Sequence, residues 1–322
     1  MLGVRVLGVA AARAVGQVAA TMLVASALAF SLVPLFPGDP AFAILSQAVG
    51  PLPSAEAIAG KRAELGLDRP LAERYLSYLS SVGHGDLTRS WVSNTPVSEL
   101  FASRAGATAL LAGTALALAL ATTIALGLIS AAGSGRWPDE LARTLAIGGA
   151  AIPPFVLGLL CLQYVVIKLG VGKVVTDGTV HTLALPAAVL ATGIACLWIR
   201  PLRALLLDAL TSPAVLVARA RGASRARVLF VHALPHAMVG FLPFVALGVG
   251  GLITGALVVE AVFSWPGLGL LVVEAVRRRD VPVIQGFTLY ATFAYVVASK
   301  GADLMARVLD PRLRSAGAWA PR

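Results

Sequence analysis

The sequence predicts an all-α polytopic membrane protein with six transmembrane helices. Of its 322 residues, 58% are hydrophobic and only 13% are charged, and the mean hydropathy is +0.84. A soluble domain of this length has no core large enough to bury so much apolar surface. The apolar residues also form separate runs that can cross about 30 Å of hydrocarbon at about 1.5 Å per residue. Helices are the expected spanning elements, because barrel strands are shorter and alternate in polarity.

Six apolar runs define the expected membrane helices. In chain order they are residues 10–36, 105–132, 141–168, 181–199, 237–263 and 281–308. We expect the first run to be a retained helix, because no small-residue cleavage site follows a short apolar core. Pro153 and Pro154 predict a break or kink in the third run, since consecutive prolines remove backbone donors and clash with the preceding turn.

These runs divide the chain into four expected regions. Residues 1–36 form an N-terminal tail and the first helix, and residues 37–104 form an external segment between the first two helices. Residues 105–314 form the membrane core, which includes a cytoplasmic loop at 206–236, and residues 315–322 form a C-terminal tail.

The basic residues predict that both chain ends face the cytoplasm. Fifteen of the 26 Lys and Arg residues fall in the segments assigned to the inside. Only five fall in the outer segments once the long 37–104 loop, where the positive-inside rule is weak, is set aside. The net charge of +10 therefore reports topology. No nucleic-acid partner is expected, because the basic residues are scattered between apolar runs.

Small residues are frequent in the apolar runs. The fifth run contains a group of glycines: Gly248, Gly250, Gly251 and Gly255. Such residues let helix backbones approach closely where lipid provides no hydrophobic drive for association. They are explained by close packing alone or by helices that must also slide.

No pattern in the chain predicts a metal centre. Cys161 and Cys196 both lie in apolar runs without metal-type spacing. His232 and His236 are four residues apart, but Pro235 interrupts the helix that would place them on one face. No nearby carboxylate or cysteine completes a ligand set.

The external segment is expected to contain two short helices. The first, residues 54–65, is capped by Ser54, has Glu56 in its first turn and ends near Gly66. The second, residues 71–82, is amphipathic, with its expected apolar face formed by Leu71, Tyr75, Leu76 and Leu79. The segment is too small for an enzyme domain and fits a cap or docking ledge on the outer mouth.

The basic 206–236 loop has helix signals of its own. Ser212 and Pro213 suit the N-cap and first position of a helix, and Gly222 suits its left-handed end. Ser224 can cap a second helix, and Pro235 is expected to force a turn at membrane re-entry. The loop is a surface for a soluble partner, or it is a positive-inside loop that only fixes topology.

Glu260 lies near the outer end of the fifth run, where a carboxylate is costly unless it faces protein or water. We interpret it as a packing or gate residue near the Pro266–Gly267 turn. The alternative is a charge that extends to the membrane interface.

The loop resembles the EAA loop of bacterial ABC-importer permeases. The resemblance rests on Ala218-Arg219-Ala220-Arg221-Gly222 followed by Leu234-Pro235. His232 replaces a common isoleucine, and Val217 or Ala218 stands where the motif has its glutamate. Other segments resemble the B-type dipeptide, oligopeptide and nickel permeases: Gly38-Asp39-Pro40, Leu65-Gly66-Leu67-Asp68-Arg69-Pro70, Gly85-Asp86-Leu87, Val259-Glu260-Ala261-Val262-Phe263, Pro266-Gly267-Leu268-Gly269, Arg279-Asp280-Val281-Pro282-Val283 and Leu309-Asp310-Pro311-Arg312.

The resemblance implies a type I ABC importer permease fold and a role for each group of residues. The coupling loop to the ATPase would comprise Ser212, Pro213, Val217, Ala218, Arg219, Ala220, Arg221, Gly222, Ala223, Leu234 and Pro235. The gate or packing candidates are Glu260, Pro266 and Gly267. The external docking candidates are Gly38, Asp39, Pro40, Asp68, Pro70, Gly85 and Asp86.

It also implies the partners and the location. The chain would be a non-catalytic, multi-pass subunit of the bacterial cytoplasmic (inner) membrane. It would assemble with a second, C-type permease, two ABC ATPase subunits or domains, and an extracytoplasmic solute-binding protein. The solute would be a peptide, nickel or a metal chelate.

The chain itself has no phosphate-binding loop, so ATP-Mg would bind only to the partner ATPases. A secondary transporter driven by an ion gradient is the alternative, but it predicts ionisable pairs near the bilayer centre and repeated broken helices. Only Pro153-Pro154 suggests such a break. An intramembrane enzyme would need a nucleophile and a base at matching depths, and no such motif stands out.

Overall fold

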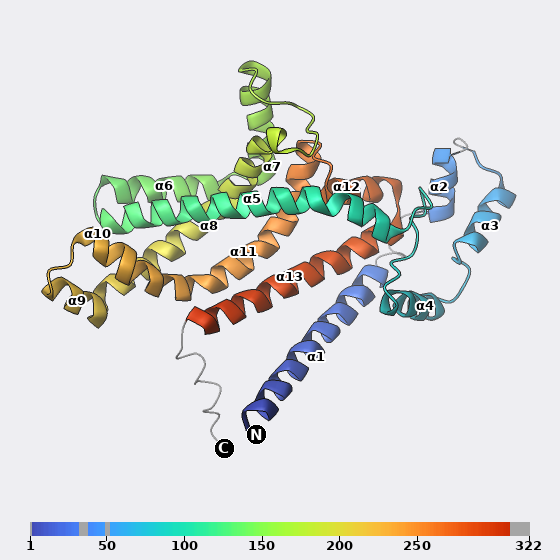
Figure 1. Ribbon diagram of the computed structural model, residues 1–322. Helices are drawn as coiled ribbons and strands as arrows, with labels where there is room; N and C mark the ends of the chain where they lie inside the picture. Colours follow the sequence, from blue (N-terminus) through green and yellow to red (C-terminus); the bar gives the residue numbers. More distant parts are fainter. Residues whose placement is uncertain (1, 32–37, 49–51, 310–322) are drawn as a thin grey trace. The chain divides into compact units, whose positions relative to one another are not determined.

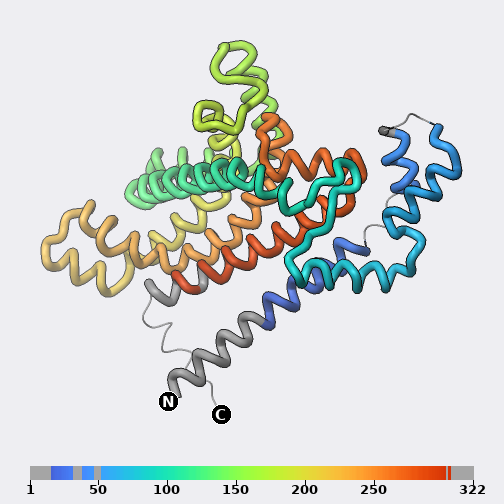
Figure 2. Tube along the Cα trace, turned by 45° about the vertical axis from the view of Figure 1, so that its right-hand side comes forward, coloured from blue at the N-terminus to red at the C-terminus, as the bar shows by residue number. Residues whose placement is uncertain are grey.

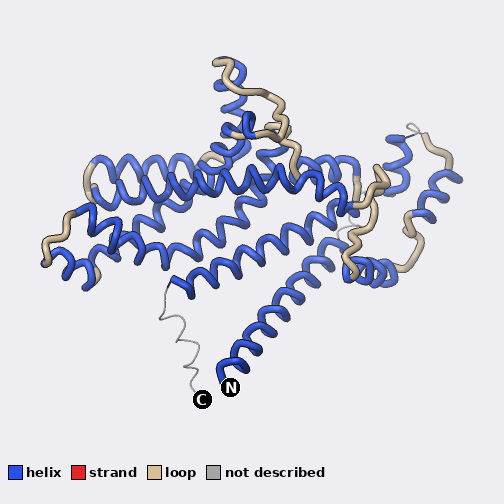
Figure 3. The backbone as a smooth tube through the Cα atoms, viewed as in Figure 1, coloured by secondary structure: helices blue, strands red, loops and turns tan. Residues whose placement is uncertain are grey.

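The computed structural model describes residues 2–31, 38–48 and 52–309. Within these residues the regular secondary structure is helical, and the only β pairing is an isolated bridge between Arg89 and Pro96 (Figure 3). The α-helices up to the first proline break are α1 Leu2–Ser31, α2 Pro40–Ala48, α3 Ala55–Glu64, α4 Leu71–Gly83, α5 Val97–Ala132 and α6 Trp137–Ala151 (Figure 1). The later ones are α7 Pro154–Cys161, α8 Ala184–Thr211, α9 Pro213–Ala220, α10 Arg225–Arg227, α11 Leu234–Val262, α12 Leu268–Arg278 and α13 Val281–Leu309.

Four of these helical stretches are long and apolar enough to cross a membrane. They are Val97–Ala132, Ala184–Thr211, Arg225–Val262 and Val281–Gly301. A fifth span is formed if Trp137–Ala151 and Pro154–Lys168 are counted together. The structure therefore supports four or five of the six expected spans. The expected first span is helical over α1, but part of it, residues 32–36, lies outside the described residues.

The predicted break in the third span is confirmed. The α6 and α7 halves meet at a bend of 96°, with Pro153 as the N-cap residue of α7 and Pro154 at its start. After α7 the chain continues as a π-helix, Leu162–Lys168. A short 3₁₀ turn at Val180–Thr182 precedes α8.

The chain divides into two compact units. One holds the chain up to Gly106 together with Gly267–Val296, and the other holds Ala107–Pro266 together with the chain from Val297. Figure 2 traces both units along the chain. In the second unit, α9 lies at the end of the bundle where α8 stops and the chain turns back toward α11 (Figures 1 and 2).

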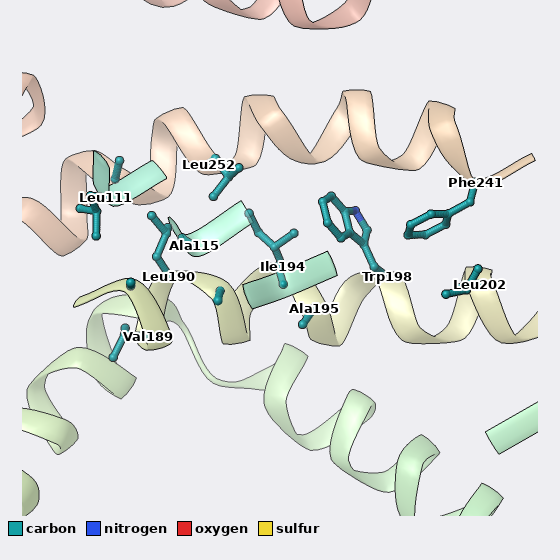
Figure 4. Packing of buried hydrophobic residues seen from close by; sticks show 14 of the residues in the cluster. Leu111, Ala115, Val189, Leu190, Ile194, Ala195, Trp198, Leu202, Phe241 and Leu252 are labelled. Atoms are coloured by element: carbon teal, nitrogen blue, oxygen red, sulfur yellow. The ribbon is translucent and has the colours of Figure 1, made fainter. Parts of the chain in front are cut away.

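The core of the second unit is centred on α8 and α11. Trp198 of α8 is only 3% exposed, and its indole Nε1 donates a 3.0 Å hydrogen bond to the carbonyl of Phe244 in α11. Its ring also meets Phe241 edge-on, with centroids 5.7 Å apart (Figure 4). The buried indole therefore has both an apolar surface and a polar partner on the neighbouring helix.

Glycines on α11 make room for the side chains of α8. A Cβ atom at Gly248 would lie 2.2 Å from Cζ2 of Trp198, and one at Gly255 would lie 2.8 Å from Cδ1 of Leu190. A Cβ atom at Gly240 would likewise lie 2.9 Å from Cδ2 of Leu205. Of the glycines noted in the sequence, Gly248 and Gly255 thus serve close helix packing, whereas a Cβ at Gly251 would meet nothing within 4 Å.

In the first unit, α4 packs through only part of the predicted face, since Tyr75 contacts Phe30 as expected but the two leucines do not pack. Leu71 and Leu76 are 46% and 65% exposed, whereas Tyr78 is 7% exposed. The ring centroids of Tyr75 and Tyr78 lie 5.3 and 5.9 Å from the ring centroid of Phe30 in α1. The prediction failed for the two leucines because the aromatic contacts with Phe30 determine which face is buried.

The other predicted external helix is confirmed. α3 starts after Ser54, whose hydroxyl accepts a 3.2 Å hydrogen bond from the amide of Ala57. Gly66, just beyond the helix, has a positive φ of 65°, a conformation that glycine adopts without steric cost.

Replacement of Gly248 by alanine should destabilise the second unit, because the new methyl group overlaps the Trp198 ring. Overpacking of this kind costs about 1–3 kcal/mol, so the apparent melting temperature in detergent should fall by several degrees. Gly251→Ala is the matched control on the same helix and should leave the melting temperature unchanged. Equal melting temperatures for native protein and the Gly248 variant would contradict the close packing.

Candidate functional site

The short helix α9 begins at the predicted residues, but its start is held differently from the prediction. Ser212 is the N-cap residue and Pro213 takes the first turn. The Ser212 hydroxyl makes no capping hydrogen bond. Its backbone carbonyl instead accepts from the amides of Val215 and Leu216, both at 3.1 Å. The carbonyl thus pairs with the Val215 amide that the hydroxyl was expected to cap.

The end of α9 is a Schellman motif built around Gly222. The Gly222 amide donates to the carbonyl of Arg219 at 2.9 Å, and the Ala223 amide donates to the carbonyl of Ala218 at 3.0 Å. Gly222 has a φ of 83°, the left-handed conformation that the motif requires. The predicted helix end is therefore confirmed, and it fixes the direction in which the chain leaves α9.

α9 has one face against the protein and one face open. Val215 and Ala218 are buried, at 1% and 8% exposure, and the helix contacts the end of α8 and the 228–233 segment. Leu216 and Val217 are 56% and 51% exposed. The exposed residues on and after α9 also include Ala220 and four arginines, Arg219, Arg221, Arg225 and Arg227. An apolar surface beside several cations is typical of a protein interface.

The chain re-enters the bundle without the turn predicted at Pro235, so that prediction is wrong. Ser224 caps α10 as expected, accepting from the Arg227 amide at 3.3 Å. A π-helix, Val228–Ala233, then leads directly into α11, where Leu234 and Pro235 form the start. Proline is tolerated there because the wider π turn accommodates the missing backbone donor.

A buried ion pair ties α6 to α8, the helix that leads to α9. Both carboxylate oxygens of Asp139 accept from the guanidinium of Arg203, at 2.6 and 2.7 Å. The same carboxylate accepts from the Ser130 hydroxyl and from the Gly135 amide. Its side chain is 4% exposed. With these four donors the buried charge is fully paired, and α5, α6 and α8 are joined at one point.

Glu260 is buried inside the second unit. It is 0% exposed, and the Thr108 hydroxyl donates a 2.8 Å hydrogen bond to its Oε1 atom. The following turn is also held in place, because the Trp265 indole donates to the carbonyl of Ala107 at 3.0 Å. The alternative of an exposed interfacial charge is wrong. Packing is observed, and a gating role stays a prediction.

The two other gate candidates lie at the end of the same turn. A Cβ at Gly178 would meet Cγ of Pro266 at 2.7 Å, so the 170s loop and this proline are in close contact. Gly267 is the N-cap residue of α12.

Two of the three acidic docking candidates in the external segment are paired with one arginine. Arg62 of α3 donates to Asp39 at 2.8 Å and to Asp68 at 3.0 Å. Hydrogen bonds to Asp68 and Asp39 raise the pKa of the Arg62 guanidinium above its usual value. Asp39 also caps α2 by accepting from the Ala41 amide at 2.9 Å. These contacts hold α2, α3 and the turn before α4 together.

The remaining external candidates shape turns. Gly38 and Gly85 have φ values of 90° and 81°, and Pro70 is the N-cap residue of α4. Pro40 starts α2, and Asp86 accepts from the Thr88 amide at 2.8 Å.

Three residues that form buried polar contacts were not among the predicted site residues. Two of them are Asp139 and Arg203. Asp280 was noted only as part of a motif, yet it is 5% exposed and accepts from the Ser90 hydroxyl and the Trp91 amide. The position of the two aspartates in the sequence could have pointed to such contacts, because Asp139 and Asp280 each lie at the start of an apolar helix.

No group of three potential metal ligands occurs among the residues that the structure describes. In that part of the chain, the two cysteines are free thiols.

Two family models match the sequence. The model for binding-protein-dependent transport system inner membrane components matches residues 123–315. The model for the N-terminal region of such membrane components matches residues 7–112. Together they cover both units of the chain.

Curated relatives match over nearly the whole length. The glutathione transport system permease protein GsiC of Escherichia coli O6:H1 is 37% identical over 295 residues, which are 91% of this chain and 95% of that protein. GsiC of Escherichia coli strain K12 is 36% identical over the same shares, and GsiC of Salmonella typhimurium is 37% identical. Among solved structures, an amino acid ABC transporter crystallised with histidines aligns at 18% identity with a TM-score of 0.47, covering 67% of this chain and 94% of that one.

Proposed function

Because this chain belongs to the family of binding-protein-dependent transport system inner membrane components, we propose that it couples ATP-driven closure of partner ATPases to the uptake of a peptide-like solute. As a member of this family it is a permease subunit of an ABC importer in the inner membrane. The ion-gradient alternative finds no support in the family matches or the relatives.

Glutathione or a related short peptide is the proposed solute. The support is the match to GsiC relatives along 91% of this chain. Nickel and metal chelates are less favoured, because these relatives are named for glutathione transport.

The proposed assembly has four kinds of protein. This chain would pair with a second permease of the C type, and two ATPase subunits or domains would bind on the cytoplasmic side and hydrolyse ATP. A solute-binding protein would deliver the solute on the outer side. Both termini of this chain would face the cytoplasm, with α9 on the same side.

The proposal that α9 couples to the ATPase rests on the exposed face of this helix. Leu216 and Val217 present apolar surface to solvent although α9 is anchored through Val215 and Ala218. A cleft on an ATPase would cover this surface, and the surrounding arginines would help orient it. ATP binding favours one arrangement of the ATPases, so α9 would act as a lever that shifts the bundle between two packed states.

The substitution Leu216→Glu should uncouple transport. The new charge lies on the exposed face, so the fold should persist, but the apolar contact with the ATPase would be lost. We expect at least about a tenfold fall in solute-stimulated ATP hydrolysis by the reconstituted complex, as for loss of an interface hot spot of about 1.4 kcal/mol or more.

Leu76→Glu is the matched control, since Leu76 is 65% exposed but lies on α4 in the external segment. It should leave the binding of the ATPase subunits and their basal hydrolysis intact, whereas Leu216→Glu should also weaken the binding of the ATPase subunits. Full solute-stimulated hydrolysis in the Leu216 variant would refute α9 as the coupling helix.

The external segment is proposed to dock the solute-binding protein. α3 supports this, because none of its residues is buried and its surface is free to meet a partner. Gly38, Asp39, Pro40, Asp68, Pro70, Gly85 and Asp86 would then act mainly by holding the shape of this surface.

Deletion of residues 54–65 should abolish stimulation of the ATPase by the loaded binding protein and spare basal hydrolysis. Arg62→Met is a milder variant, because it removes the contacts with Asp39 and Asp68 but keeps α3. It should lower the stimulation only in part, since these contacts hold the shape of the docking surface. A deletion variant that is still fully stimulated would exclude α3 as a docking surface.

A further inference from the structure

An open cavity of about 920 Å³ lies between α6 and α8 in the second unit, and we call it the α6–α8 groove. Both helices belong to stretches that are apolar enough to cross a membrane. Part of the lining is apolar and consists of alanines together with Ile147 and Leu197, which are 54% and 63% exposed. The charged side chains in the described lining are all arginines: Arg143, Arg200 and Arg203.

Two of these arginines already have carboxylate partners. Arg203 is bound by Asp139 through two hydrogen bonds, and Arg143 lies 3.3 Å from Glu140. Arg200 is exposed and forms no ion pair with a carboxylate of the described residues. An uncompensated charge within a membrane span is costly, so an anion bound in the groove would stabilise Arg200.

The basic part of the groove lies close to one end of the membrane spans. Trp137 is the first residue of α6 and is 77% exposed, and an exposed tryptophan at the end of a span is typical of the membrane–water interface. Arg143 follows six residues later, about 9 Å along the helix axis. At this depth an arginine can extend its guanidinium to the interface while its methylene groups stay on apolar surface.

The surface of α6 beside the groove is suited to lipid. Leu141 and Leu145 are each 51% exposed, so this side of the helix presents apolar side chains below the interfacial tryptophan. An apolar groove with an unpaired cation at the depth of the headgroups matches an acyl chain and its phosphate. Basic pockets between membrane helices bind anionic headgroups in this way. The carboxylate of a peptide would use the cation but leave the apolar lining uncovered.

We propose that the α6–α8 groove binds one anionic phospholipid, with its phosphate at Arg200 and Arg143 and an acyl chain along Ile147, Ala150 and Leu197. The lipid would come from the leaflet on the side of α9. That this leaflet is the cytoplasmic one rests on the proposed function, which places α9 in the cytoplasm. An anionic headgroup is favoured over a zwitterionic one, because the ammonium group of the latter would be repelled by the arginines.

Native mass spectrometry of the assembled transporter tests this site. The complex would be reconstituted in nanodiscs of equal parts phosphatidylglycerol and phosphatidylcholine, and the lipids that stay bound after release into detergent would be counted. The native complex should retain phosphatidylglycerol in preference to phosphatidylcholine. Arg200→Met should lower the retained phosphatidylglycerol about fivefold, the effect expected when one arginine is lost from contact with anionic lipid.

Four further variants separate charge, shape and folding. Arg200→Lys keeps the charge and should retain most of the phosphatidylglycerol, whereas Arg278→Met removes an exposed arginine outside the lining and should change nothing. Ala150→Phe would fill the apolar part of the groove and should lower retention although all three arginines remain. Thr144→Phe is its control, because Thr144 is exposed on α6 but does not line the groove. Equal melting temperatures of native protein and Arg200→Met in phosphatidylcholine nanodiscs would exclude misfolding.

Three outcomes would overturn the site. One is equal retention of the two lipids by the native complex, and another is unchanged retention of phosphatidylglycerol in Arg200→Met. The third is displacement of phosphatidylglycerol by added glutathione, which would assign the groove to the path of the solute. ATP-driven uptake would be measured on the same complex. A complex that retains phosphatidylglycerol selectively but lacks uptake would count against the proposed function and not against the lipid site.

Discussion

The close approach of α8 and α11 determines the geometry of the second unit. Three glycines of α11 each receive a large side chain of α8, and the buried Trp198 indole is hydrogen-bonded across the same seam. A packed interior has few intermediate arrangements, so helices joined in this way move together or separate fully. The two helices that flank α9 are therefore expected to behave as one lever, with α9 at its tip.

The contacts around that lever explain how a short surface helix could act on the bundle. The Schellman motif at Gly222 and the buried Val215 and Ala218 hold α9 against the ends of its neighbours. The Asp139–Arg203 pair joins α6 to α8, so a displacement of α8 is passed on to the helix before the 96° bend. Force applied to the exposed face of α9 would thus reach the bent span through the buried contacts of α9 and the Asp139–Arg203 ion pair.

Local signals in the sequence predicted much of this arrangement. Prolines and glycines marked the α6–α7 bend and both ends of α9, because backbone geometry at these residues depends on few neighbours. Prediction failed where tertiary contacts decide. Leu71 and Leu76 were placed on the apolar face of α4 together with Tyr75, but Phe30 packs against Tyr75 and Tyr78. The Pro235 turn was wrong because a π-helix absorbs the proline. The pairing of Asp139 with Arg203 joins positions 64 residues apart, and no local pattern connects them.

Pulsed electron paramagnetic resonance tests the lever most directly. Spin labels would replace Val217 of α9 and Leu247 of α11, both exposed, in a chain whose Cys161 and Cys196 are changed to serine. The distance between the labels would be measured in the assembled transporter without nucleotide and with ATP trapped by vanadate. A rigid lever predicts the same distance in both states, while labels at Val217 and on the partner permease move relative to one another. A change in the Val217–Leu247 distance between the two states would show that α9 moves independently of α11 and would contradict this account.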